Sequence, residues 1–228
     1  MSAVRRRRHP LPLLMAAAML VGCTSSSEDA PRVVQPGAPG DASRELSASE
    51  LAAIDYSDYG EADVAFMQHM ILHHVQALRL TRLVPDRTAR EDIPLLARRI
   101  DLSQEAELEQ MRAWLLERDE PVPSLLAGHD HDEVTVPDDE LMPGMLTEQE
   151  LLAVEAASGE AFDRLFLEAM IRHHEGALQM VTELFDAESG ATDLSVSSFA
   201  NHVAADQTIE IGRMRRILDE LDAGDAAG

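Results

Sequence analysis

Two clusters of methionine and histidine are the groups in this chain best suited to chemistry. Each has the pattern Met-x-x-His-His, and the second lies 100 positions after the first. Side chains three and four positions apart share one face of a helix, so a helix places each methionine one turn below its histidines. One thioether with two imidazoles suits Cu(I), whereas imidazole with carboxylate suits Cu(II) or zinc. The candidate metal ligands are Met70, His73, His74, Met170, His173 and His174.

Packing is the alternative explanation for both clusters, and the pattern leaves it open. Methionine at core spacing commonly fills space, and a duplication copies structural residues as well as ligands. Imidazoles flanked by apolar residues are nevertheless costly to bury unless they find partners, and these pairs occur in both copies. We therefore expect a bound transition metal, copper or zinc, over a structural or a catalytic role.

The two clusters belong to an internal repeat. Residues 46–78 match residues 146–178 without gaps, with twelve identities in 33 positions. A second block, at a shift of 103, repeats the pattern Gln-x-x-Glu-x-x-x-Met. Its members are Gln104, Glu107 and Met111, and Gln207, Glu210 and Met214. His69 and Met180 occur in only one copy, so a role for either would break the symmetry.

Each repeat predicts a short lead-in helix, a long helix, a turn and a second long helix. Ser47 and Thr147 each precede a glutamate by three positions, a spacing typical of a capping box at a helix start. Asp63 and Asp163 are predicted in the first turns of the long helices, where the helix dipole favours a carboxylate. Pro85 is predicted to end the first long helix, and Pro121 and Pro123 to end its partner.

The predicted fold is all-α, a four-helix bundle made of two duplicated helical hairpins with short lead-in helices. One hairpin cannot bury its apolar stripe, but two related hairpins can bury each other's. Aromatic residues make up only 4% of the chain, so we expect almost no strand. The repeated domain spans 46–221, with repeat 1 at 46–118, a connector at 119–145, repeat 2 at 146–221 and a tail at 222–228.

The first residues of the chain predict an export signal. Four arginines at positions 5–8 precede an apolar stretch, Leu11 to Val21, that is too short for a stable membrane span. Residues 20–23, Leu-Val-Gly-Cys, have the form of a lipobox, although an ordinary signal peptide with a chance cysteine remains open. We expect a signal peptide at 1–22, a lipidated Cys23, and a flexible tether rich in serine, proline and glycine over 23–45.

Charge and cysteine content exclude several classes of function. Removal of the four leader arginines lowers the formal net charge from −23 to −27, which repels nucleic acid and anionic lipid headgroups. The membrane is therefore a partner only through the lipid anchor, on the periplasmic or outer cell-surface side. Cys23 is the only cysteine, so once it is lipidated no thiol remains for disulfides or metal binding.

The repeated segments resemble a known bacterial family. DVAFMQHMILHHVQAL and DRLFLEAMIRHHEGALQM are similar to the signature D-x-x-F-x-x-x-M-I-x-H-H-x-x-A-L of the family called domain of unknown function 305. The resemblance covers roughly residues 46 to 221 and implies a ferritin-like helical bundle. The family includes exported proteins linked to copper binding and tolerance. Carried over by position, it implies the six methionine and histidine ligands named above.

The leading interpretation is an extracytoplasmic lipoprotein that binds copper for sequestration or tolerance, without chemical turnover. A metal-dependent oxidoreductase and a structural or interaction lipoprotein are the alternatives. Neither histidine pair carries the Glu-x-x-His motif of di-iron bundles, because methionine stands in place of the glutamate. The connector holds a separate candidate, His129-Asp130-His131-Asp132-Glu133, which is either a weak metal site or a solvated acidic turn.

Replacement of the lipobox cysteine tests the anchor. The variant Cys23→Ala should lose membrane association and keep its helical fold, because the tether separates the anchor from the domain. Cell fractionation and circular dichroism measure the two properties. Retention of the Cys23→Ala protein in the membrane fraction would contradict the lipid anchor.

Overall fold

The computed structural model describes residues 33–35, 40, 42–47, 59–123 and 136–225. Within these residues, β1 (Val33–Gln35) and β2 (Arg44–Leu46) form an antiparallel pair with Val33 opposite Leu46. Strand β1 lies in the segment 23–45 that was predicted as a tether, and β2 crosses the boundary to the domain predicted from residue 46. The tether sequence shows no apolar periodicity, so these strands were not predicted. The pair is the one departure from an all-helical structure in the described residues.

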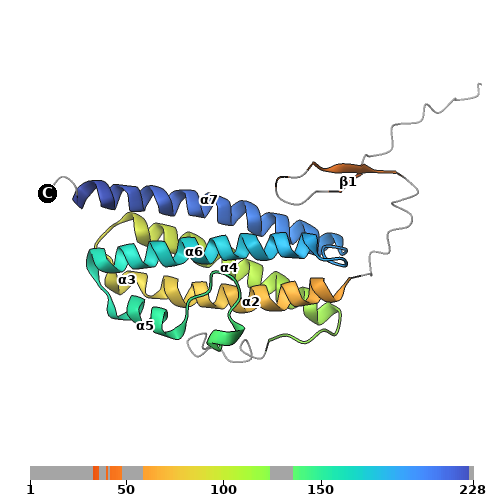
Figure 1. The fold of residues 1–228 in the computed structure, drawn as a ribbon, viewed down its shortest axis with the longest axis horizontal. Coiled ribbons are helices and arrows are strands. Elements are labelled where there is room, and N and C mark those ends of the chain that lie inside the picture. Colours follow the sequence, from red (N-terminus) through yellow and green to blue (C-terminus); the bar gives the residue numbers. More distant parts are fainter. Residues whose placement is uncertain (1–32, 36–39, 41, 48–58, 124–135, 226–228) are drawn as a thin grey trace, which may run out of the picture. The chain divides into compact units, whose positions relative to one another are not determined.

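Four long helices dominate the described residues (Figure 1). They are α2 (Glu61–Arg82), α4 (Asp92–Glu117), α6 (Gly159–Asp186) and α7 (Leu194–Asp225). Helix α2 packs along α4, α6 packs along α7, and the two hairpins meet through α2 and α6. This arrangement confirms the prediction of an all-α bundle built from two hairpins. Every helix among the described residues is too short or too polar to span a bilayer.

Short helices connect the hairpins and confirm one of the two predicted lead-in helices. Helix α5 (Glu148–Ala156) begins at Thr147, whose hydroxyl accepts a hydrogen bond from the Glu150 amide at 3.3 Å. The Glu150 carboxylate accepts one from the Thr147 amide at 2.8 Å, which completes the predicted capping box. Residues 48–58, where the lead-in helix after Ser47 was predicted, lie outside the described residues.

The predicted helix ends differ slightly from those observed. Helix α2 ends at Arg82, and Pro85 lies in the first turn of the short helix α3 (Val84–Arg87), where no backbone N–H is needed. Helix α4 ends at Glu117, before Pro121 and Pro123. A single-turn 3-10 helix, η3 (Asp138–Glu140), lies in the described part of the connector.

Asp63 links the two hairpins at the start of α2. Its carboxylate accepts hydrogen bonds from the Gly60 amide at 3.1 Å and, across the bundle, from Ala191 and Asp193 amides at 2.6 and 3.2 Å. Its counterpart Asp163 is the fifth residue of α6, just past the predicted first turn, because α6 begins at Gly159. The Asp163 Oδ1 atom is buried without a hydrogen-bond partner in the described structure.

Two apolar clusters fill the bundle. The first contains Phe66, Met70, Met111, Trp114 and Phe199, among others. The second contains Ile93, Phe162, Phe166, Met170 and Met214, among others. On α4, α6 and α7, the members of the two clusters are separated by a short stretch of buried polar residues.

The end of the connector lies directly against α6. We call residues 142–146, Met-Pro-Gly-Met-Leu, the crossing segment. A Cβ atom placed on Gly176 of α6 would lie 1.9 Å from the Pro143 carbonyl oxygen, and Gly144 has a positive φ of 78°. The Gln76 side chain of α2 holds the same segment, because its amide donates to the Leu146 carbonyl at 2.9 Å and accepts from the Leu146 amide at 2.7 Å.

Two glycine substitutions test this close approach. Gly176→Ala should destabilise the fold by about 1–3 kcal/mol, because the new methyl group must displace the backbone of Pro143. Gly212→Ala on α7 is the matched control, since its nearest neighbour is an Arg216 nitrogen at 3.9 Å. Alanine there should stabilise the helix by up to about 1 kcal/mol. Chemical denaturation measures both changes, and equal stability of the two variants would contradict the packing.

Candidate metal centre

A layer of eight polar side chains crosses the bundle between the two apolar clusters, and each long helix contributes two of them. All eight residues are buried, with exposed fractions from 0 to 9%. We call this set the polar layer: His73 and His74 from α2, Gln104 and Glu107 from α4, His173 and His174 from α6, and Gln207 and Glu210 from α7. The layer joins the four predicted histidines to four residues that were not predicted as ligands.

The two repeats meet at the centre of the layer. The rings of His73 and His173 lie with centroids 3.8 Å apart and planes tilted by 39°. These residues occupy equivalent positions in the repeat, on the two helices that join the hairpins. The duplication therefore brings its two histidine pairs to one place.

Each outer histidine is bonded to a glutamate of its own hairpin. His74 Nε2 lies 2.6 Å from Glu107 Oε2, and His174 Nε2 lies 2.9 Å from Glu210 Oε2. His73 Nε2 lies 2.9 Å from the Pro143 carbonyl oxygen of the crossing segment. Carbonyl and carboxylate oxygens accept hydrogen bonds, so these three histidines donate through Nε2–H.

The opposite nitrogen of each of these rings then carries a lone pair. The Nδ1 atoms of His73, His74 and His174 are buried and have no hydrogen-bond partner, and both ring nitrogens of His173 are unpartnered as well. Both amide atoms of Gln104 and the Oε1 atom of Gln207 also lack hydrogen bonds, whereas Glu210 Oε1 forms an ion pair with Arg99 Nε at 3.7 Å. Buried polar atoms without partners cost free energy, which marks the layer as a place where a ligand is expected.

Burial keeps the central imidazoles neutral. Desolvation lowers the pKa of His73 from 6.5 to about 3, against a smaller opposing effect of the Pro143 hydrogen bond. Burial, followed by repulsion from the neighbouring histidines, also lowers the pKa of His173 well below 6.5. A neutral imidazole is the form that binds a metal, so burial keeps these two rings in the protonation state that coordination requires.

The two predicted methionine ligands lie on opposite sides of the layer. Met70 and Met170 are both fully buried, but Met70 belongs to the first apolar cluster and Met170 to the second. Each is accompanied by the repeated methionine of its neighbouring helix, Met111 with Met70 and Met214 with Met170. A thioether is therefore available from each side of the histidines.

The donor set of the layer fits a soft metal ion. No three side chains among the described histidines, aspartates and glutamates gather tightly enough to hold a metal by themselves. Imidazole nitrogens with flanking thioethers instead suit Cu(I), which accepts few ligands. The residues that sequence reasoning missed are Glu107 and Glu210, although the pattern repeated at a shift of 103 already contained them. Cys23 and the segment His129 to Glu133 lie outside the described residues.

A comparison with protein families matches most of the helical bundle. Positions 63–218, from the first turn of α2 to the last turns of α7, match the family described as domain of unknown function (DUF305). The chain belongs to the DUF305 family. No curated protein matches the chain.

Solved structures confirm the fold of this DUF305 chain. A DUF305 fragment from Deinococcus radiodurans is 31% identical with a TM-score of 0.60, covering 71% of this chain and 98% of the other. A DUF305 protein from Streptomyces coelicolor, described as secreted, is 26% identical with a TM-score of 0.57, covering 71% and 94%. CopM in its Cu(II)-bound form is 24% identical with a TM-score of 0.53, covering 69% and 96%, and shares the fold.

Acid should destabilise the metal-free protein through the central histidines. The unfolded chain binds a proton at His73 near pH 6.5, whereas the folded chain binds it only near pH 3. The stabilising contribution is therefore complete above pH 6.5 and is lost as the pH falls from 6.5 toward 3. At about 1.4 kcal/mol for each pKa unit, His73 alone accounts for a loss of several kcal/mol across this window.

Urea unfolding of the metal-free protein between about pH 7 and about pH 5 measures this slope, because most carboxylates titrate below that range. His73→Gln is the control, since its amide can still donate to the Pro143 carbonyl but does not titrate. Its stability should fall less steeply with acid. An unchanged slope in His73→Gln would show that this imidazole is not the titrating group.

Proposed function

We propose that this protein is a cell-envelope lipoprotein that binds copper in its polar layer, for sequestration or tolerance, without chemical turnover. The observation that carries the proposal is the set of three histidines whose Nε2–H is already bonded to an acceptor. Each of these rings keeps its Nδ1 lone pair buried and unpartnered.

The carboxylates support this role because metal-binding histidines commonly donate their other ring N–H to a carboxylate or carbonyl. Such a partner fixes the tautomer and the ring orientation and makes the free nitrogen a better ligand. Glu107 and Glu210 hold this position toward His74 and His174, one in each hairpin. The Pro143 carbonyl holds it toward His73.

The thioethers support copper as the metal. Met70 and Met170 flank the histidines in sequence and lie in the apolar clusters on either side, so each repeat can supply sulfur next to imidazole. Sulfur and imidazole together favour Cu(I), while the imidazoles alone would also accept Cu(II) or zinc. CopM, which shares the fold, has been solved with Cu(II) and with Cu(I) bound, and this supports copper as the first ion to test.

The export signal and the lipobox support a location on the outer side of a membrane, with Cys23 as the anchor. The DUF305 protein from Streptomyces coelicolor, which is described as secreted, agrees with export of this fold. The formal charge of −27 after the leader adds a general attraction for cations at that location.

Replacement of both methionines separates the ligand role from packing. In Met70→Leu/Met170→Leu the volume is nearly conserved, so the metal-free protein should lose less than about 1.5 kcal/mol of stability for each change. Leucine has no sulfur lone pair, so Cu(I) affinity should fall by at least about tenfold. Competition with a Cu(I) chelator measures affinity, and thermal melting of metal-free protein measures stability.

Met67→Leu is the matched control for this experiment. Met67 is 2% exposed, lies on α2 one turn before Met70 and packs in the first apolar cluster. Its replacement should leave Cu(I) affinity unchanged. Zinc affinity should change little in the double variant, because sulfur contributes less to a harder site. Unchanged Cu(I) affinity in a folded double variant would show that both methionines only fill the core.

A further inference from the structure

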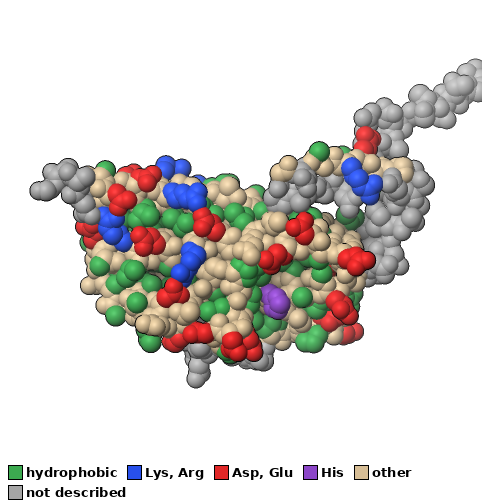
Figure 2. All heavy atoms as spheres, in the orientation of Figure 1, with side chains coloured by type: hydrophobic (Ala, Val, Ile, Leu, Met, Phe, Trp, Pro, Cys, Tyr) green, Lys and Arg blue, Asp and Glu red, His purple; other side chains and the backbone are tan. Residues whose placement is uncertain are grey.

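A surface pocket of about 200 Å³ lies between the start of α2, the crossing segment and the end of α6. Four of its lining side chains carry metal-ligating atoms: His69 from α2, Met142 from the crossing segment, and Met180 and Glu183 from α6. Three separate elements therefore contribute to one pocket. Figure 2 shows one face of the molecule, on which an imidazole reaches the surface among apolar and acidic side chains.

The exposure of these side chains distinguishes them from core filling. His69 is exposed, and no hydrogen bond or ion pair holds its ring among the described residues. Met142 is half-buried, and Met180 is 6% exposed at the wall of the pocket. An unpaired imidazole and two thioethers that face one cavity form a nitrogen and sulfur donor set, and such a set favours Cu(I).

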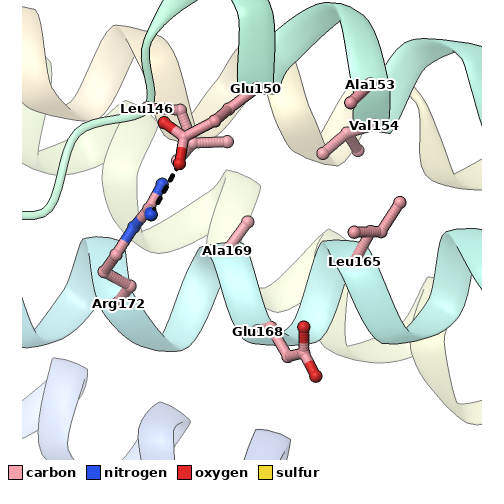
Figure 3. Close-up of a pocket in the computed structure, with 8 residues that line it drawn as sticks. All are labelled: Leu146, Glu150, Ala153, Val154, Leu165, Glu168, Ala169 and Arg172. Atoms are coloured by element: carbon pink, nitrogen blue, oxygen red, sulfur yellow. Dashed lines mark hydrogen bonds and ion pairs between the residues drawn. The ribbon is translucent and has the colours of Figure 1, made fainter.

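The duplication provides an internal comparison at two positions, because the matching surface of α6 also lines a hollow, against a different neighbouring element. The pocket in Figure 3 is lined by Leu165 and Ala169, which correspond to Ala65 and His69 at a shift of 100 positions. Alanine stands there in place of His69, and the lining contains neither histidine nor methionine. Glu150 and Arg172 instead face each other across it and form an ion pair of 2.7 Å.

Packing of the bundle therefore does not require ligand atoms at this position. In repeat 2 this helix surface lines a hollow together with apolar side chains of α5 and the Glu150–Arg172 ion pair. In repeat 1 the described residues that line the pocket include four side chains with metal-ligating atoms. His69 and Met180, which break the symmetry of the sequence, both line this pocket.

We propose that this pocket is a second copper site, in which His69, Met142 and Met180 bind Cu(I) at the surface and pass it inward to the polar layer. The inward transfer rests on the proposed function. Pro143 lines the pocket, and its carbonyl accepts the hydrogen bond from His73 Nε2 at 2.9 Å, so one residue contacts both sites. Glu183 adds a negative charge at the mouth that favours entry of a cation.

Methionine methyl groups report on the two sites separately. The full chain is labelled with ¹³C at the methionine ε-methyl groups, and Cu(I) is added under anaerobic conditions while methyl resonances are recorded. Single Met→Leu variants assign the signals. The Met142 and Met180 signals should shift together and saturate at one equivalent of ion for the surface pocket. The Met70 and Met170 signals report on the polar layer in the same titration.

The two sites can fail independently in this experiment. If Met142 and Met180 do not respond while Met70 and Met170 do, the surface site is excluded and the proposed function stands. If the surface signals alone respond, the surface site stands, and Cu(I) binding by Met70 and Met170 beside the polar layer is excluded. If neither pair responds, the surface site is overturned, and so is the role of Met70 and Met170 as copper ligands.

Two variants test the assigned ligands. His69→Gln should weaken Cu(I) binding at the Met142 and Met180 signals by roughly tenfold and leave the apparent affinity at Met70 and Met170 unchanged at equilibrium. Met145→Leu is the matched control, because Met145 belongs to the crossing segment but does not line the pocket. It should change neither site. Unchanged binding at Met142 and Met180 in His69→Gln would overturn the assignment of His69.

Discussion

Burial of a polar layer inside an apolar bundle is the constraint on which the rest of this structure depends. Eight polar side chains lie between two hydrophobic clusters, and the Nδ1 atoms of three of the four histidines there keep unpaired lone pairs. Groups of this kind are tolerated only where neighbouring residues fix them or a ligand satisfies them. Hydrogen bonds to Glu107, Glu210 and the Pro143 carbonyl fix three of the histidine rings. The methionines on either side are softer donors.

The path of the crossing segment against α6 depends on the same buried polar layer. His73 needs an acceptor for its Nε2–H, and a backbone carbonyl supplies one only if the connector approaches α6 closely. Gly176 permits that approach because it has no side chain, and Gln76 fixes the segment through both backbone groups of Leu146. One stretch of chain thus closes the polar layer and also forms a wall of the surface pocket.

Periodicity and repetition were sufficient to predict the helices, because both signals are local or compare the chain with itself. The two hairpins and the capping box at Thr147 could be predicted in this way, whereas the contact between His73 and His173 depends on how the hairpins pack. The pairing of His74 with Glu107 could not, since it depends on the rotation of α2 against α4. The hydrogen bond of His73 to Pro143 depends on a connector path that no pattern specifies, and the placement of Asp163 depends on where α6 begins.

The contacts of Asp63 constrain the order in which the two hairpins complete their folding. Three of its hydrogen bonds reach Ala191, Thr192 and Asp193, at separations of 128, 129 and 130 residues. The start of α2 therefore gains these partners only after the turn between α6 and α7 has been synthesised. A chain that crosses a membrane from its amino end would carry its first hairpin without this link during most of its passage. Completion of the fold then waits for the second hairpin, so the polar layer forms only when both repeats have arrived.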